Sequence, residues 1–260
     1  MAERQLIDLL SPTPRAEYGK VSEQLRNARE RLLARTQRII GNPVLKPLAE
    51  VTGFRETNRD HVALGMRKIV TIRTLCPTLA TELDFDVIEP MFFVHDDGEM
   101  SLKVDVPAYG PGRDSIAGQQ AKLNEIPFAI LRAFPRLKDP ALQQHYEELF
   151  CRYYAQDKGD GEAVFAKLID RIVGSADVNA DHVTRNWVYL YDAPPVELTT
   201  HVVCTTAKLL DSARALWPNI SADAQKELYP FVEEAFIKIE NSGFAESLAP
   251  QRERLITLNS

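Results

Sequence analysis

The chain has 260 residues, of which 45% are hydrophobic and 26% are charged. This composition excludes a disordered or fibrous chain, and the length excludes a miniprotein that needs disulfides to fold, so we expect one large domain or one domain with an extension. The formal net charge of −6, which divides into +3 over residues 1–50 and −9 over residues 51–260, argues against a general nucleic-acid-binding protein but not against a small anionic substrate.

Apolar residues recur at a helical spacing along almost the whole chain, and signals for β-hairpins are scarce. We therefore predict an all-α fold. The first predicted helix covers residues 17–40, and we assign no chemistry to its arginine-rich face. The second predicted helix begins at residue 58 or 59 and ends at residue 75.

The pattern is less regular in the next part of the chain. After Pro77 a short helix is predicted for residues 79–83. Residues 86–95 (DVIEPMFFVH) are apolar enough to be fully buried, and charged residues follow them. Residues 104–112 contain two prolines and two glycines, which predicts a loop over the surface.

Helices account for most of the remaining sequence. They are predicted over residues 115–134, 140–155, 162–174, 199–216 and 222–239. The helix over residues 140–155 has an apolar stripe formed by Leu142, Tyr146, Leu149, Phe150 and Tyr153.

The three cysteines, Cys76, Cys151 and Cys204, are odd in number and far apart. They argue against a disulfide framework and against a thiolate zinc site, and thus favour a reducing compartment. Charged residues interrupt the first ten residues where a signal peptide needs an apolar core, and no segment approaches the length of a membrane span. We expect a cytoplasmic protein with no membrane and no nucleic-acid partner.

His95 and Asp96 stand together at the end of the buried run. An ionised carboxylate in such a place needs a cationic partner, and a divalent metal would provide one. His61 could supply a second imidazole from another helix, and Asp170, which lies among apolar residues, a second carboxylate. Two imidazoles and two carboxylates suit one Mn, Co, Fe, Ni or Zn ion better than calcium or magnesium.

The order of these residues resembles a known family. His61 is followed 34 residues later by His95-Asp96, and Asp170 comes another 74 residues on; this resembles the H…HD…D motif of the HD-domain metal-dependent phosphohydrolases. Residues 95–99 (HDDGE) are similar to the HDxxE variant of the 5′-deoxynucleotidase branch. The flanking sequences are also similar to that branch, namely Arg55-Glu56 before Asp60-His61, and Glu162-Ala163 followed by Phe165, Lys167 and Asp170.

The resemblance covers about residues 54–178 and implies an HD-domain helical bundle with extensions at both ends. On this basis we divide the chain into an N-terminal helical extension (residues 1–50), an HD phosphohydrolase core (residues 51–180) and a C-terminal helical extension packed on the core (residues 181–260). Dimers are common in the resembling branch, which implies a homodimer.

The resemblance also implies roles for individual residues. His61, His95, Asp96 and Asp170 would bind one divalent metal, which would keep open positions for water and a phosphate oxygen. Glu99, one turn beyond the histidine if the helix continues, would orient the attacking water or transfer its proton. Arg55 would bind the substrate phosphate, and Asp105 would contact a sugar hydroxyl or assist the leaving oxygen.

The function implied is cleavage of a phosphate ester of a small metabolite by metal-activated water, with a nucleoside 5′-monophosphate as the favoured substrate. A nucleoside triphosphohydrolase or another HD hydrolase stays open, although Met100 after Glu99 departs from the HDxxED motif of guanosine tetraphosphate hydrolases. A di-iron HD oxygenase would use two further histidines before Asp170, and only His145 lies in that interval. A binding or regulatory protein without catalysis is the alternative from a different class.

Overall fold

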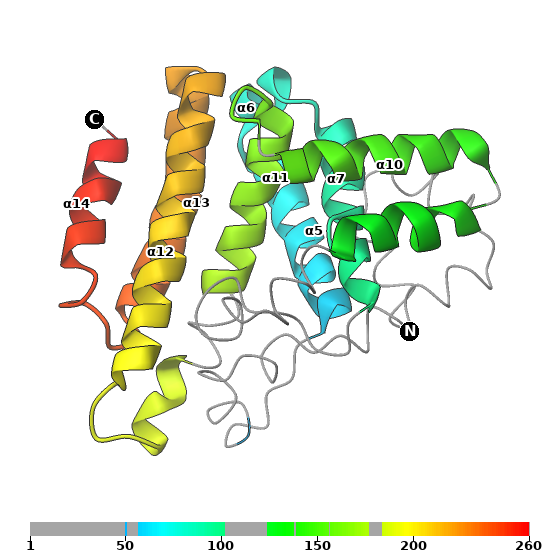
Figure 1. Cartoon of the computed structure of the whole chain (residues 1–260). Coiled ribbons are helices and arrows are strands. Elements are labelled where there is room, and N and C mark those ends of the chain that lie inside the picture. The colour runs from blue at the N-terminus through cyan, green and yellow to red at the C-terminus, as the bar shows by residue number, and fades with distance from the viewer. Residues whose placement is uncertain are drawn as a thin grey trace.

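We describe a computed structural model of the chain, which covers residues 50, 57–101, 124–137, 139–155, 157–176 and 184–259. Within these ranges the ordered elements are helices and no strand occurs (Figure 1), so the prediction of an all-α fold is confirmed. The predicted helix at residues 17–40 and the predicted loop at residues 104–112 lie outside the described residues. That the helices form an HD-type bundle stays a prediction.

The α-helices are α5 (Asn58–Leu75), α6 (Pro77–Glu82), α7 (Phe85–Val94), α10 (Pro140–Ala155), α11 (Gly161–Ile172), α12 (Val196–Leu216), α13 (Ala222–Glu240) and α14 (Ala249–Leu258). Shorter helical segments are the 3-10 helices Asp97–Ser101, Phe134–Arg136, Thr184–Tyr189 and Trp217–Asn219, and the π-helix Ala129–Ala133.

Most predicted helices occur close to their predicted boundaries. The helix α10 begins and ends at the residues expected for it. The helix α6 begins at Pro77, earlier than predicted, because proline is tolerated in a first helical turn, where its missing N–H has no partner to lose. The helix α14 was not predicted.

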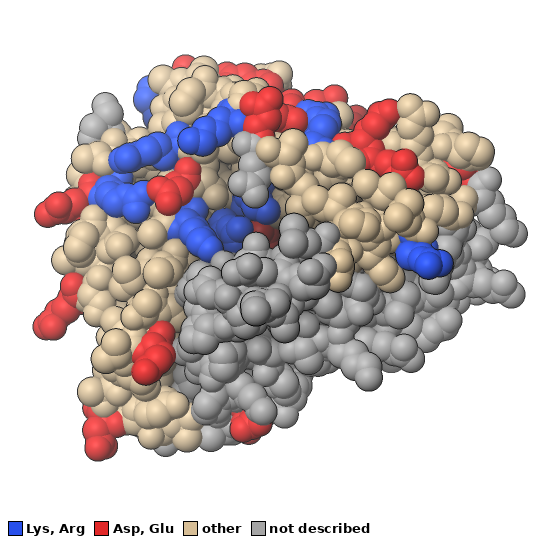
Figure 2. Space-filling view, viewed as in Figure 1, with Lys and Arg blue, Asp and Glu red and all other residues tan. Residues whose placement is uncertain are grey.

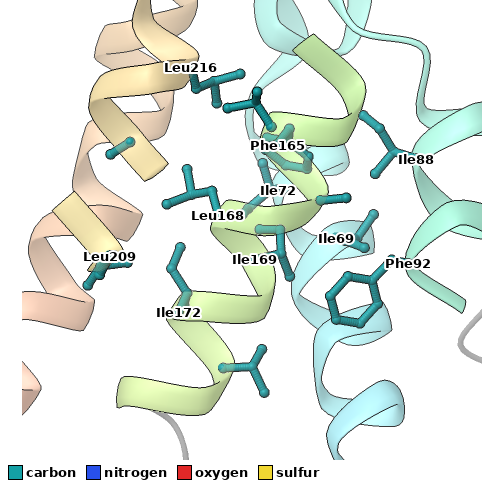
Figure 3. Close-up of a cluster of buried hydrophobic side chains, with 14 of the residues drawn as sticks. Ile69, Ile72, Ile88, Phe92, Phe165, Leu168, Ile169, Ile172, Leu209 and Leu216 are labelled. Carbon is teal, nitrogen blue, oxygen red and sulfur yellow. The ribbon is translucent and has the colours of Figure 1, made fainter. Parts of the chain in front are cut away.

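The helix α11 lies in the middle of the fold, between α5 and α7 on one side and α12 on the other (Figure 1). Its apolar residues point both toward α5 and α7 and toward α12. Figure 3 shows Phe165 and Ile169 beside side chains of α5 and α7, and Leu168 and Ile172 on the side of Leu209 from α12. All five side chains are at most 1% exposed, so the described hydrophobic core is continuous on both sides of α11.

Two glutamates hold the C-terminal helices against α6. Glu227 of α13 accepts hydrogen bonds from the backbone N–H groups of Thr78 and Leu79, at 2.9 and 3.2 Å. In the other direction, Glu82 of α6 accepts one from the N–H of Ser221, at 2.7 Å. Each carboxylate therefore satisfies N–H groups that a helix start leaves without intrahelical partners.

None of the described helices combines the length and the hydropathy that crossing a membrane would require. The described core includes side chains from both sides of the predicted boundary after residue 180, from Val62 to Leu258. The helices of residues 184–259 thus pack on those of residues 57–176. The division of the chain into three parts stays a prediction.

Candidate metal centre

His95 and Asp96 directly follow the last residue of α7. The start of α7 is fixed by Asp84, whose side chain accepts from the N–H of Asp86, and its end is at Val94. Both side chains of the pair are buried, at 2% and 5% exposure. Nε2 of His95 lies 3.1 Å from Oδ1 of Asp96, so the two neighbours point to the same place at the end of the helix.

The backbone of α7 sets the orientation of the His95 ring. Nδ1 of His95 lies 2.6 Å from the carbonyl oxygen of Phe92, which accepts a hydrogen bond when Nδ1 carries the proton. This leaves Nε2 as the nitrogen with a lone pair. Histidines that bind metals are held in this way, with the second ring nitrogen donating to a carbonyl or carboxylate.

His61 comes from the second turn of α5. Thr57 and Asp60 form a capping box at the start of that helix, which fixes the first turn and the direction of the buried imidazole. The rings of His61 and His95 lie 5.5 Å apart. His61 and His95 together with Asp96 form a buried group whose donor atoms all lie within 4.8 Å of one another.

The close approach of α5 to α7 depends on Gly65. A Cβ atom at this position would lie 2.1 Å from the ring of Phe92, too close for any side chain without displacing the ring. Because the carbonyl of Phe92 orients His95, Gly65 is coupled to the metal centre through packing. The sequence gives one signal for it, a glycine in the interior of a strongly predicted helix.

Asp170, from α11, joins the group at a second side. Its Oδ1 lies 3.1 Å from Nε2 of His61 and 3.9 Å from Nε2 of His95. Its Oδ2 accepts a hydrogen bond from the hydroxyl of Tyr153, at 3.0 Å, and lies 3.8 Å from Nη1 of Arg171. The carboxylate thus has one oxygen toward the imidazoles and the other toward donors of the protein.

The surroundings keep Asp170 ionised. Burial by itself raises the pKa of this carboxyl group. The charges of Arg171, His95 and Lys167, together with a hydrogen bond with His61, outweigh burial, and the pKa lies well below its ordinary value. Burial and the nearby charge of Asp170 raise the pKa of Tyr153 well above its ordinary value. The tyrosine therefore keeps its proton and donates to the carboxylate.

His61, His95 and Asp96 form a buried group that could hold a metal ion. Asp170 lies beside the two imidazoles, and its place as a fourth ligand stays a prediction. Two donors that each lie about 2.1 Å from one ion are about 3 Å apart when they meet at roughly a right angle. The separations of 3.1 Å between His61 and Asp170 and between His95 and Asp96 agree with this. The donors are two nitrogens and carboxylate oxygens, a mixed set that Mn, Fe, Co, Ni or Zn accepts.

Glu99 is brought to this region by a change of helix type. The placement of Glu99 one turn beyond His95 was conditional on a continuing helix. The helix α7 ends at Val94, and Glu99 lies in the following 3-10 helix, where its N–H donates to the carbonyl of Asp96 at 2.9 Å. Its side chain is buried, at 5% exposure, and Oε2 accepts a hydrogen bond from Nδ2 of Asn58, at 2.6 Å. Asn58 lies one turn before His61 in α5, so Glu99 is held against the turn that carries His61.

A second buried carboxylate lies nearby. Glu125 is 1% exposed, and the hydroxyl of Tyr154 donates to its Oε2 at 3.2 Å. Burial together with the charges of Glu125, Glu99 and Asp96 raises the pKa of Tyr154 well above its ordinary value. Glu125, Tyr153 and Asn58 were not predicted as site residues, because nothing in their local sequence separates them from ordinary helix residues.

Two cations of α11 border the metal centre. Nζ of Lys167 lies 4.0 Å above the ring of Tyr153, and Arg171 follows Asp170 directly. On the face drawn in Figure 2, most of the Lys and Arg side chains gather over α11, α12 and α14. Lys167 and Arg171 thus bring positive charge to the border of the metal centre in a chain whose net charge is −6.

The other predicted site residues, Arg55 and Asp105, lie outside the described residues. Among the remaining histidines, His201 is buried in α12, at 7% exposure.

Comparison of the chain with family models, with curated proteins and with solved structures finds no match. The resemblance to the HD phosphohydrolases therefore depends on the order and chemistry of the residues alone. A function for this protein therefore depends on the geometry of the buried histidines and carboxylates.

Proposed function

We propose that the protein is a metal-dependent phosphohydrolase that cleaves the phosphate ester of a small metabolite, and that its substrate is a nucleoside 5′-monophosphate. The observation that carries the proposal is the meeting of His61, His95, Asp96 and Asp170, which come from α5, the end of α7 and α11. All four residues are at most 9% exposed. Buried polar groups are costly unless they are compensated, which favours a functional reason for this group.

The four side chains would hold one divalent transition metal. Bound there, the metal would supply Lewis acidity, which lowers the pKa of a neighbouring water and polarises a phosphoryl group. The hydrogen bond from His95 to the carbonyl of Phe92 prepares the site, because it presents Nε2 with its lone pair.

Glu99 is the group we assign to proton transfer. It lies outside the set of four ligands, and Asn58 fixes one of its oxygens. A carboxylate held in this way can accept the proton of the attacking water and return it to the leaving oxygen. Asn58 is then a positioning residue for Glu99.

Lys167 and Arg171 favour an anionic substrate. They are the charged residues of α11 that flank Asp170, and both are partly exposed. Guanidinium and ammonium groups bind phosphate oxygens, so these two residues can hold the substrate phosphate while the ester bond breaks. Arg55 as a further phosphate contact, and Asp105 as a contact of the sugar or the leaving oxygen, stay sequence predictions.

The test is a phosphate-release screen over nucleoside mono- and triphosphates with Mn²⁺, Co²⁺, Mg²⁺ and Zn²⁺, on the wild type and on Asp96→Asn. We expect release of orthophosphate from a nucleoside monophosphate by the wild type and loss of that activity in the variant. Asp86→Asn is the matched control, since Asp86 lies in α7 but pairs with the partly exposed Arg73. It should retain the activity.

The metal content of the purified protein is measured beside the screen, and the two measurements separate the alternatives. Release of triphosphate would indicate a nucleoside triphosphohydrolase, and two irons per chain would support an oxygenase. If the wild type and Asp96→Asn are equally inactive with every substrate and no metal is bound, the protein is not a phosphohydrolase of this kind.

A further inference from the structure

The hydroxyl of Tyr153 distinguishes the two oxygens of Asp170. It donates to Oδ2 at 3.0 Å, and Arg171 approaches the same oxygen at 3.8 Å. Oδ1 instead faces Nε2 of His61 at 3.1 Å and Nε2 of His95 at 3.9 Å. A carboxylate can rotate or bind a metal through both oxygens, so a hydrogen bond that occupies one oxygen restricts how the other is used.

Packing holds the phenol of Tyr153 in place. The side chain is 3% exposed, and its ring lies 5.1 Å from the ring of His95. Lys167 places its ammonium 4.0 Å above the ring. A cation at this position attracts electron density from the phenol, which strengthens the O–H group as a donor. The hydrogen bond to Asp170 is therefore supported from a second residue of α11.

We propose that Tyr153 is a positioning residue that makes Asp170 a one-oxygen ligand, with Oδ1 directed to the metal and Oδ2 retained by the protein. This inference rests on the metal site of the proposed function. Its consequence is that Asp170 fills one coordination position and not two, which leaves room for water and a phosphate oxygen beside His61, His95 and Asp96.

The experiment is a titration of metal-stripped protein with Co²⁺, followed by visible absorption, on the wild type and on Tyr153→Phe. Phenylalanine keeps the ring and removes only the hydroxyl. We expect about tenfold weaker binding, the lower end of what loss of a hydrogen bond to a ligand costs. We also expect weaker visible bands, because a second oxygen of Asp170 then enters and raises the coordination number of Co²⁺.

Tyr146→Phe is the matched control. Tyr146 is a buried tyrosine of the same helix, at 4% exposure, and its ring packs on that of Phe134. Its variant should bind Co²⁺ with the affinity and the spectrum of the wild type. A purely structural loss in Tyr153→Phe would lower the melting temperature and leave the spectrum of the bound Co²⁺ unchanged.

The outcomes separate this inference from the proposed site. If the wild type binds no Co²⁺, the metal site fails and the inference with it. If the wild type binds and Tyr153→Phe has the same affinity and spectrum, the inference is overturned while the site stands. If the variant does not fold, infrared spectra of the wild type decide: a wide separation of the metal-induced carboxylate stretches supports one-oxygen binding, and a narrow pair that is absent from Asp170→Asn overturns it.

Discussion

The two sides of α11 bury different kinds of side chain. On the side of α5, α7 and α10, the buried residues include His61, His95, Asp96 and Glu99. On the side of α12, α13 and α14, the core consists mainly of aliphatic and aromatic residues, such as Leu209. One continuous hydrophobic core therefore contains a part that only stabilises the fold and a part that also gathers charge.

Charge is handled differently on the two sides. In the C-terminal helices the buried Glu240 pairs with Arg252, whose side chain is half exposed, and the buried His201 is kept neutral by its low pKa. Near α5 and α7 the imidazoles and carboxylates face one another, an arrangement that a metal would complete. The comparison predicts that substitutions in the C-terminal helices change stability alone, whereas those on the other side change metal binding as well.

The largest effect is expected from Leu209→Ala. Leu209 is fully buried between α12 and α11, and the cavity left by alanine should lower the free energy of unfolding by about 3 kcal/mol. Urea denaturation measures this. Metal affinity of the folded protein should not change, and a change would contradict the separation of the two sides. Leu75→Ala is the control, because Leu75 is 63% exposed and its loss should have little effect.

The next effect concerns pH and His201. Burial, with a smaller contribution from Lys208, lowers the pKa of this imidazole from 6.5 to about 4. Above pH 6.5 it is neutral in the folded and the unfolded chain. Between pH 6.5 and 4 the unfolded chain binds a proton that the folded chain does not, so stability falls with falling pH, by about 3 kcal/mol in all.

His201→Gln tests this prediction. Urea denaturation of the wild type and the variant at pH 7, 5.5 and 4.5 should give free energies whose pH dependence is weaker in the variant. Parallel curves for the two proteins would mean that His201 is protonated at the same pH in both states.

Metal binding should stabilise the side of the fold that contains α5 and α7. With free metal at about 100 times its dissociation constant, the free energy of unfolding of the wild type should rise by about 2.7 kcal/mol, and EDTA should reverse the change. Thermal unfolding of Asp96→Asn should be insensitive to the same metal. Leu209→Ala should gain as much as the wild type, unless the two sides are coupled.

The smallest effects come from two helix caps. Thr57 caps α5, and Ser221 caps α13 by accepting from the N–H of Ala224. Replacing either with alanine should lower stability by about 1 kcal/mol. Only Thr57→Ala should also weaken metal binding, because α5 carries His61. Equal metal affinities in the two variants would show that the first turn of α5 does not position the imidazole.

The helical fold could be predicted because its apolar spacing and its end signals agree. Asp160 and Ser221 stand as side-chain caps before α11 and α13, and those helices were predicted. The helix α14 begins after Leu248, which makes no side-chain capping bond, and only Pro250 in its first turn marks its start. The end of α7 at Val94 agrees with the end of the apolar run at residue 95, but the 3-10 helix that follows has no counterpart in the sequence pattern.

The histidines and carboxylates of the candidate site could be predicted from the sequence, but the side chains that hydrogen-bond to them could not. His61, His95, Asp96 and Asp170 stand out because charged or polar groups occur in apolar surroundings. Tyr153 was predicted as part of an apolar stripe, and its ring is indeed buried; only the fold places its hydroxyl against Asp170. The contact of Asn58 with Glu99 joins residues 41 positions apart, which periodicity cannot reveal.

The most direct test of the central claim is a calorimetric titration of metal-stripped protein with Mn²⁺, on the wild type and on Asp96→Asn. We predict one ion per chain for the wild type. For the variant we predict binding weaker by more than about 100-fold, because loss of a ligand should cost more than loss of a hydrogen bond to one. Absence of binding to the wild type, or equal binding to both proteins, would contradict the assignment of this buried group as a metal centre.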